Sequence, residues 1–303
     1  MGKHKGDSIN GWLIIDKQEG IGSTDVVNQT RRLLNANKNG HTGTLDPFAT
    51  GVLPIAFGEA TKLIPYVTDG TKEYEFTLKF GSSTDTLDLT GNITQSGGKI
   101  PSKDEILNIL PQFIGQITQI PPAYSAIKIN GQRAYDLARK GQDISIPERQ
   151  IEIYELELIS ILSADEYKFR VLCSKGTYVR TLGADIAKKL GTFGHLTALR
   201  RTKCAKFDLS HTILLENLKN MSYIGERQSQ LLPLLTSLCD ITVIAVREED
   251  ATKLHMGQKI SPKTYDITNI VGQDVIATYN NEAVALVRIE ESKISPIRVF
   301  NLK

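Results

Sequence analysis

Asp46 is the residue of this chain with the clearest setting for chemistry. It lies in a loop that also holds Gly40, Gly43 and Gly51, where the lack of side chains lets a bulky ligand approach the backbone. Pro47 keeps Asp46 out of helical geometry, and apolar neighbours on both sides favour a dry site. A carboxylate in such surroundings acts as a nucleophile or a base. The alternative is a turn in which the Asp46 side chain only bonds its own backbone, as Asp-Pro pairs often do.

A basic segment between Lys168 and Lys206 indicates a polyanionic partner. Ten of its residues are Lys or Arg and only Asp185 opposes them, although the whole chain has a formal net charge of +2. Such a local field on a near-neutral protein favours a nucleic acid bound at one face. The alternative is an ordinary charged surface that acidic segments elsewhere neutralise.

The composition excludes several other classes of protein. With 303 residues, 40% hydrophobic and 23% charged, the chain is globular and long enough for a main domain plus a small one. No apolar run is long enough for a membrane span, and the polar N-terminus predicts no export, so we expect a cytoplasmic protein. The three cysteines and five histidines lack the spacing of disulfide or metal sites, which predicts no metal.

The elements that must position Asp46 are strands and helices in irregular order, which disfavours a doubly wound parallel sheet. Residues 74–80 alternate between apolar and polar without error, as in a half-buried strand. Ser23 or Thr24 is expected to cap the first helix. The predicted strands are 11–16, 52–57, 74–80, 151–159 and 167–173, and the predicted helices are 23–36, 103–115 and 181–190.

Two further segments stand apart from this body. Residues 124–150 are polar and punctuated by Gly131, Gly141 and Pro147, which predicts an excursion from the main fold. A boundary is expected near 235–241. The short β-like runs that follow it are 241–246, 275–279 and 283–289.

The segment around Asp46 resembles the catalytic motif of a known family. Residues 40–54, GHTGTLDPFATGVLP, are similar over fifteen contiguous positions to the motif of TruB, the family of bacterial tRNA pseudouridine synthases. Dyskerin-like, guide-dependent enzymes carry a similar motif. The likeness covers about residues 9–240, and it extends to the segments 10–20, 58–62 (GEATK), 174–181 (SKGTYVRT) and 199–201 (LRR).

The resemblance implies an α+β fold. A catalytic domain (1–240) would hold a central mixed, mostly antiparallel sheet, with residues 124–150 as a thumb-like insertion. A small β-rich, PUA-like domain (241–303) would follow it. The implied activity is isomerisation of uridine 55 in the T loop of tRNA to pseudouridine without a cofactor, after the base is flipped into a pocket.

The implied partner is tRNA, bound at its T arm and elbow and recognised largely by shape. Neither a membrane nor a guide RNA is expected, and we expect a monomer. Two competing hypotheses remain. The chain could be a tRNA-folding chaperone in which isomerisation is secondary, or a guide-dependent subunit. The second is disfavoured because the extra terminal regions typical of those subunits are not seen.

Three residues carry the catalytic roles that the resemblance implies. Asp46 would either add to C1′ of the cut nucleotide or remove its 2′ proton, and both routes stay open. Arg180 would pair with Asp46 and keep it ionised, the alternative being a phosphate contact. Tyr74 would stack on the flipped base and help to remove its C5 proton, whereas an ordinary tyrosine on an apolar strand is a core residue.

Four more residues match positions that hold the substrate. Tyr178 and Leu199 match pocket-lining positions, although both side chains are equally compatible with a core. His41 matches a histidine that fills the space left by the flipped base. Lys17 matches a lysine that supports the catalytic loop or contacts RNA, and Gln18 follows it where the family motif usually has proline.

Basic residues in two segments are expected to contact phosphates, because phosphate contacts supply most of the affinity for nucleic acids. The alternative for the insertion is a flexible surface loop. The predicted contacts are Lys128, Arg133, Arg139, Lys140 and Arg149 in the insertion, and Arg200 and Arg201 in the basic segment.

Overall fold

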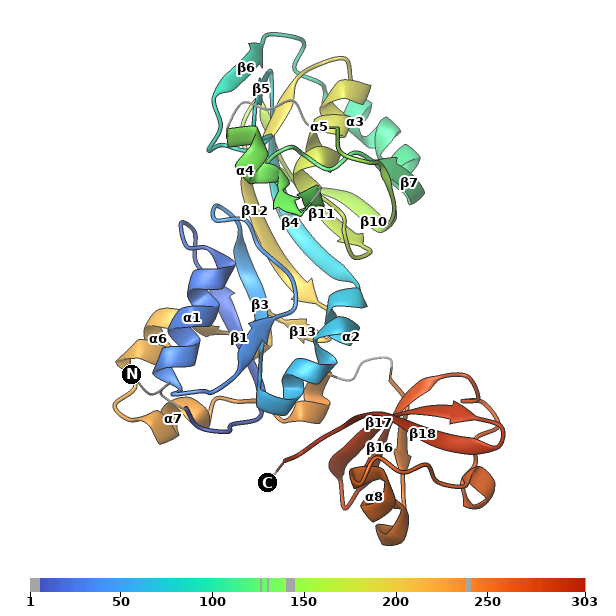
Figure 1. The fold of residues 1–303 in the computed structure, drawn as a ribbon. Coiled ribbons are helices and arrows are strands. Elements are labelled where there is room, and N and C mark those ends of the chain that lie inside the picture. The colour runs from blue at the N-terminus through green and yellow to red at the C-terminus, as the bar shows by residue number, and fades with distance from the viewer. Residues whose placement is uncertain (1–5, 126, 130, 140–144, 238–240, 303) are drawn as a thin grey trace.

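A bent sheet of ten strands forms the main body of the protein (Figure 1). The computed structural model describes residues 6–125, 127–129, 131–139, 145–237 and 241–302. Eight strands follow one path across the sheet. In spatial order they are β14 (Ile213–Leu214), β1 (Gly11–Lys17), β3 (Thr50–Phe57), β12 (Gly194–Cys204), β4 (Lys72–Phe80), β11 (Glu166–Cys173), β10 (Arg149–Ile161) and β7 (Gly115–Gln119).

The sheet is mixed and mostly antiparallel, as predicted. Only the pairs β14–β1 and β3–β12 are parallel, and the other pairs along the path are antiparallel. Two short strands extend it, β2 (Asn39–His41) beside β3 and β13 (Phe207–Asp208) beside β12. The α+β class is therefore confirmed.

Both faces of β1 are buried, which explains its continuous apolar sequence. Leu13 and Ile15 pack in one cluster with Val26 of helix α1 (Ser23–Leu33), whereas Trp12 and Ile14 pack in a second cluster on the opposite face. Helices α6 (Leu215–Asn220) and α7 (Ile224–Gln228) complete this half of the body.

The other half of the sheet is covered by helix α5 (Val179–Lys189), whose Leu182 joins Phe76 and Leu78 of β4 in the main core. The strand predicted at 74–80 is thus present, with Phe76, Leu78 and Phe80 buried on its apolar face, although Thr77 on the other face is buried as well. The helix predicted at 103–115 is shorter than expected. A capping box between Ser102 and Glu105 starts α3 (Lys103–Ile109), and a 3-10 turn replaces its last part.

Strand β12, which was not predicted from the sequence, joins the two halves. It pairs with β4 over most of its length and with β3 only at Arg200 and Arg201. The backbones approach so closely there that a Cβ on Gly51 would lie 2.1 Å from the Arg201 carbonyl oxygen, and Gly51 has a φ of +101°. Only glycine fits this crossing, which brings the loop before β3 against the middle of the sheet.

A separate four-stranded sheet with an α-helix and a short 3-10 helix, Pro262–Thr264, forms the C-terminal domain, as expected for a small β-rich unit. Its Phe300 is buried in the cluster that contains Trp12 of the main body. The predicted boundary near 235–241 lies partly outside the described residues. The elements are β15 (Val243–Ala245), α8 (Glu248–His255), β16 (Asp274–Tyr279), β17 (Glu282–Glu290) and β18 (Lys293–Val299).

The described residues of the insertion predicted at 124–150 contain little regular structure. The hairpin β8 (Lys128–Ile129) and β9 (Gln132–Arg133) leads into helix α4 (Ala134–Arg139). A second hairpin, β5 (Ser82–Thr84) and β6 (Ile93–Ser96), follows β4.

Among the described residues, no helix has the length and apolar character needed to traverse a bilayer.

Candidate active site

An ion pair between Asp46 and Arg180 lies where the two halves of the sheet meet. Arg180 Nε is 2.9 Å from Asp46 Oδ2, and the Arg180 side chain is only 4% exposed. Its two terminal nitrogens donate to the carbonyl oxygens of Thr86 and Tyr124, both at 2.8 Å. Asp88, buried on the far side of the guanidinium, has Oδ2 3.5 Å from Nη1. Arg180 is therefore fixed in one orientation toward Asp46.

The electrostatic setting of Asp46 suits a reactive carboxylate. Burial raises its pKa above the ordinary value, the positive charge of Arg180 lowers it again, and the negative charge of Asp88 adds to the rise. Desolvation strengthens the nucleophilicity and basicity of the anion, while the guanidinium favours the anionic form. The predicted pairing of these two residues is thus present in the structure.

The loop that carries Asp46 is fastened by a serine at the start of α1. The Ser23 hydroxyl donates to the Leu45 carbonyl and accepts from the Leu45 N–H, each at 2.9 Å. The expectation that Ser23 or Thr24 caps α1 is wrong, because Gly22 occupies the cap position without a side-chain bond and Ser23 is already the first helical residue. The Ser23 hydroxyl instead binds the backbone of the loop at Leu45.

Lys17 supports the same loop from behind. Its side chain is fully buried, and Nζ donates to the carbonyls of Gln18, Ile21 and Pro47 at 3.0, 2.8 and 3.1 Å. Burial lowers its pKa to about 8, although the charge of Asp46 opposes that shift. Of its two expected roles, support of the loop matches these contacts. Its placement among the substrate-binding residues is wrong, because its ammonium group is used inside the protein.

Arg201 is also buried, with 1% of its surface exposed. Its Nε donates to the Val52 carbonyl at 2.7 Å and Nη2 donates to the Gly43 carbonyl at 3.2 Å. The guanidinium thereby joins the two ends of the loop that contains Asp46. The expectation that Arg201 contacts phosphate is wrong, because the side chain points into the protein beneath the loop.

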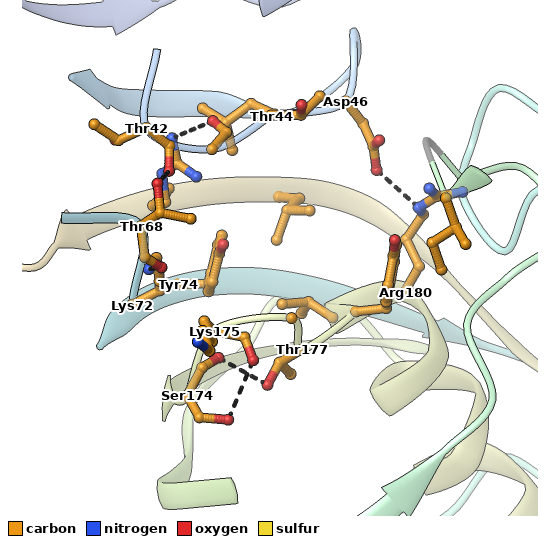
Figure 2. A pocket seen from close by; sticks show the side chains of 18 residues that line it. Thr42, Thr44, Asp46, Thr68, Lys72, Tyr74, Ser174, Lys175, Thr177 and Arg180 are labelled. Carbon is orange, nitrogen blue, oxygen red and sulfur yellow. Dashed lines mark hydrogen bonds and ion pairs between the residues drawn. The ribbon is translucent and has the colours of Figure 1, made fainter. Parts of the chain in front are cut away.

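A cavity of about 340 Å³ opens beside the ion pair, within the range of about 300–1,000 Å³ that is usual for ligand pockets. Figure 2 shows Asp46 and Arg180 at one end of it and Thr42, Thr68 and Lys72 at the other. The predicted site residues that line it are Asp46, Tyr74, Tyr178, Arg180, Leu199 and Arg201.

Tyr74 stands in this cavity between its two ends. Burial raises the pKa of its phenol to about 12, and the nearby Arg201 charge only partly offsets this effect. The hydroxyl is therefore neutral over the physiological range. Such a side chain offers an aromatic face and one hydroxyl, rather than a phenolate.

His41 does not line the cavity. It ends β2, just before the loop, and its Nδ1 accepts a hydrogen bond from the Gly43 N–H at 3.3 Å. Burial, reinforced by the charge of Arg201, lowers its pKa. The imidazole is thus in its neutral form at pH 7, and its proposed entry into an RNA loop stays a prediction.

The other predicted phosphate contacts differ in their surroundings. Arg200 forms a bidentate pair with Asp16, at 3.0 and 2.7 Å, and keeps 35% of its side chain exposed. Arg149 lies with its guanidinium carbon 5.6 Å from the centre of the Tyr178 ring. Three of the remaining residues lie on the insertion and the fourth lies outside the described residues. They are Lys128 on β8, Arg133 on β9 and Arg139 on α4, and Lys140, respectively.

Three residues that hold the site were not predicted from the sequence. Asp88 sits behind Arg180, and Thr68 and Lys72 line the far end of the cavity. Lys72 is two residues before Tyr74, so a strand places both on one face. That spacing was visible in the sequence, but nothing in it distinguished a buried lysine from an exposed one.

Comparison with known proteins gives the same family over most of the chain. The TruB family pseudouridylate synthase N-terminal domain matches residues 31–179, and the tRNA pseudouridylate synthase B C-terminal domain matches residues 180–238. A tRNA pseudouridine synthase B from Caulobacter vibrioides is 42% identical over 306 residues, covering 99% of each chain. One from Rhizobium johnstonii is 43% identical over 308 residues, covering 98% of each.

Solved structures give the corresponding fold. A chain of a Cbf5-Nop10-Gar1 complex aligns with a TM-score of 0.72 at 23% identity, over 96% of this chain and 84% of that one. Fold and site together are those of a pseudouridine synthase, an enzyme that isomerises uridine in RNA. Within that class, this chain belongs to the TruB family of pseudouridylate synthases. The prediction of an RNA-binding isomerase that modifies tRNA is thereby confirmed.

Proposed function

We propose that this enzyme converts uridine 55 in the T loop of tRNA to pseudouridine, with Asp46 as the carboxylate that reacts with the flipped nucleotide. The observation that carries the proposal is the Asp46–Arg180 pair, at 2.9 Å, beside a cavity of about 340 Å³. A carboxylate with one open face toward such a cavity meets the ribose of an extruded nucleotide rather than bulk water.

The reaction is balanced by the substrate itself. The N1–C1′ bond of uridine breaks, the base turns, and a C5–C1′ bond forms. The proton from C5 is lost and a proton is gained at N1, so no cofactor or redox partner takes part. Asp46 acts as an anion whether it adds to C1′ or removes the 2′ proton. The fixed guanidinium of Arg180 favours that anion.

The cavity residues are assigned by their chemistry. Because the pKa of Tyr74 is raised to about 12, we assign its ring to stacking on the base rather than its oxygen to proton removal as a phenolate. Tyr178 and Leu199 enclose the base from the sides. Arg149, Arg200 and the basic residues of the 124–150 insertion would contact tRNA phosphates around the T arm and elbow.

The test is incubation of the purified protein with an unmodified tRNA transcript, followed by mapping of pseudouridine. We expect product at position 55, none in a transcript with cytidine there, and no need for an added guide RNA. Asp46→Asn should bind the transcript with unchanged affinity and form no product. Asp266→Asn, on the surface of the C-terminal domain, serves as the matched control with full activity.

The same experiment separates this function from its competitor. If the wild-type protein binds a T-arm hairpin and leaves every uridine unmodified, the proposed reaction is refuted and a chaperone role is favoured. Product at a different uridine would retain the enzyme class and refute the position. The mass of the protein in solution, measured by light scattering, tests the monomer that we propose.

A further inference from the structure

Residues 58–69 form a bracket between the C-terminal domain and the catalytic loop. The bracket consists of the 3-10 helix η1 (Gly58–Leu63) and helix α2 (Ile64–Asp69), which connect β3 to β4. It begins with the GEATK segment, one of the matched motifs, which the catalytic roles described above leave without a function. Figure 1 shows α2 on the side of the main body that faces the C-terminal domain.

One end of the bracket binds residues near the C-terminus of the chain. Lys62 Nζ donates to the Val299 carbonyl at 2.6 Å and pairs with Glu59. Glu59 Oε2 also accepts from the Asn301 N–H at 2.8 Å. Two side chains of the GEATK segment thus bind the backbone on both sides of the buried Phe300.

Helix α2 adds side-chain contacts with the same domain. The Tyr66 hydroxyl donates to Asp274 Oδ2 at 3.1 Å, and Asp274 also pairs with Arg288. Leu63 and Val67 share a buried cluster with Phe300. Apolar burial and directed hydrogen bonds therefore fix the bracket to the C-terminal domain.

The other end of the bracket holds the catalytic loop. Thr68 Oγ1 donates to the Thr42 carbonyl at 2.7 Å, and Thr42 is 1% exposed. Lys72 Nζ fixes this end of α2, since it donates to the carbonyls of Thr68 and, at 2.6 Å, of Gly70. Thr42, Thr68 and Lys72 line the cavity that contains Asp46 (Figure 2).

We propose that Thr68 is a positioning residue for the catalytic loop. We further propose that the C-terminal domain holds Thr68 in place through the hydrogen bond from Lys62 to the Val299 carbonyl. Thr42 precedes Asp46 by four residues, so the carbonyl that Thr68 binds marks the entry of the loop. Arg201 binds the next carbonyl of the loop, that of Gly43, and Ser23 binds Leu45, just before Asp46. Loss of the Thr68 bond removes one of these supports, and small misplacements of a reacting group can cost about 100-fold in rate.

The first test compares Thr68→Val with Thr68→Ser in single-turnover formation of pseudouridine. We expect the valine variant to lose about tenfold or more in the rate constant with tRNA affinity unchanged, and the serine variant to recover most of it. Thr68→Ala removes the same hydroxyl and covers a failure of the valine variant to fold. Thr212→Val, which loses an equal 2.7 Å bond to the Leu209 carbonyl elsewhere, should retain the wild-type rate.

The second test addresses the contacts of Lys62 with the Val299 carbonyl and with Glu59. Lys62→Met should slow the same step, and combining it with Thr68→Val should slow the step less than the product of the two single effects, because both act through one bracket. Lys219→Met, which also breaks a pair with a glutamate three residues earlier, is the matched control. Effects that multiply, or a wild-type rate in Lys62→Met, would remove the C-terminal domain from the proposal.

This inference rests on the proposed function, but the two fail separately. A wild-type enzyme that forms no pseudouridine at position 55 refutes the proposed function. An active wild type whose rate constant is unchanged by Thr68→Val and Thr68→Ala refutes the positioning role alone. A loss of tRNA affinity without a loss of single-turnover rate would also refute it, since it would make Thr68 a binding residue.

Discussion

The Ser23 hydroxyl bonds both backbone groups of Leu45, the residue immediately before Asp46. It donates to the carbonyl and accepts from the N–H at 2.9 Å each, and both residues are buried, with 3% of their surfaces exposed. One hydroxyl thus satisfies both the N–H and the carbonyl of Leu45, which in a sheet would bind a neighbouring strand. The position of Asp46 relative to helix α1 depends on this contact.

Replacing Ser23 with alanine should therefore affect both stability and catalysis. It leaves a buried N–H and a buried carbonyl without this partner, which costs about 1–3 kcal/mol per unsatisfied group. We expect a fall of that order in the free energy of unfolding, measured with urea, and a lower single-turnover rate. Ser163→Ala, which removes an exposed hydroxyl bonded to Asp165, is the control. An unchanged unfolding midpoint in Ser23→Ala would contradict the role assigned to the contact.

Substitution of Arg180 should change the pH dependence of the reaction as well as its rate. Arg180 lowers the pKa of Asp46 against the opposing effect of burial. In Arg180→Met the pKa of Asp46 should rise further, so activity, which needs the anion, is lost at a higher pH as the solution is acidified. The variant also loses the group that orients Asp46, and misplacement of a reacting group can cost about 100-fold in rate.

The measurement is a single-turnover pH profile of wild type and variant. Arg180→Lys retains a positive charge but cannot reproduce the bonds to both the Thr86 and Tyr124 carbonyls. Its acid limb should lie between those of wild type and Arg180→Met. Identical acid limbs in all three proteins would show that Arg180 does not control the ionisation of Asp46.

Local sequence patterns predicted much of the fold because the order of apolar residues along a strand reflects which of its faces are buried. The alternation of 74–80 and the apolar runs at 11–16 and 52–57 correspond to β4, β1 and β3. Strand β12 was missed because Arg200, Arg201 and Lys203 interrupt its apolar pattern. The burial of Arg201 depends on carbonyl groups of a loop about 150 residues away in the sequence, and no local pattern encodes such a contact.

The site shows the same difference between features that the sequence predicts and contacts that only the fold determines. Asp46, Tyr74, Arg180, Tyr178 and Leu199 were predicted by resemblance, and they line one cavity. The sequence did not separate a lysine or arginine that supports the loop from one that faces RNA. By resemblance Lys17 was expected to support the loop or to contact RNA, and Arg201 was expected to contact phosphate, whereas both side chains bind backbone carbonyls.

The two adjacent arginines Arg200 and Arg201 should now have different phenotypes. Arg200 is partly exposed, so Arg200→Gln should weaken tRNA binding and reduce the slope of log affinity against log salt by about one unit. Arg201→Gln should instead lower the unfolding temperature, because it removes both bonds to the loop ends. Equal salt slopes for wild type and Arg200→Gln would remove Arg200 from the RNA face.

The buried ammonium group of Lys17 should make stability depend on alkaline pH. Its pKa is about 8 in the folded protein, against the ordinary value of 10.5 for a free lysine side chain. Between these values the unfolded state binds more protons than the folded state, so the free energy of unfolding rises with pH. The cost of burying the charge is thus fully present below pH 8 and is relieved toward pH 10.5. A shift of this size corresponds to about 3 kcal/mol.

Other groups titrate in the same range, so the difference between two proteins isolates this effect. Lys17→Met fills the same space without an ionisable group, and urea unfolding of both proteins from about pH 7 to pH 10.5 gives the comparison. The wild type should gain stability relative to Lys17→Met as the pH rises, by up to about 3 kcal/mol. Parallel curves would mean that Lys17 has the same pKa in the folded and unfolded states, and that its three carbonyl partners fully offset its desolvation.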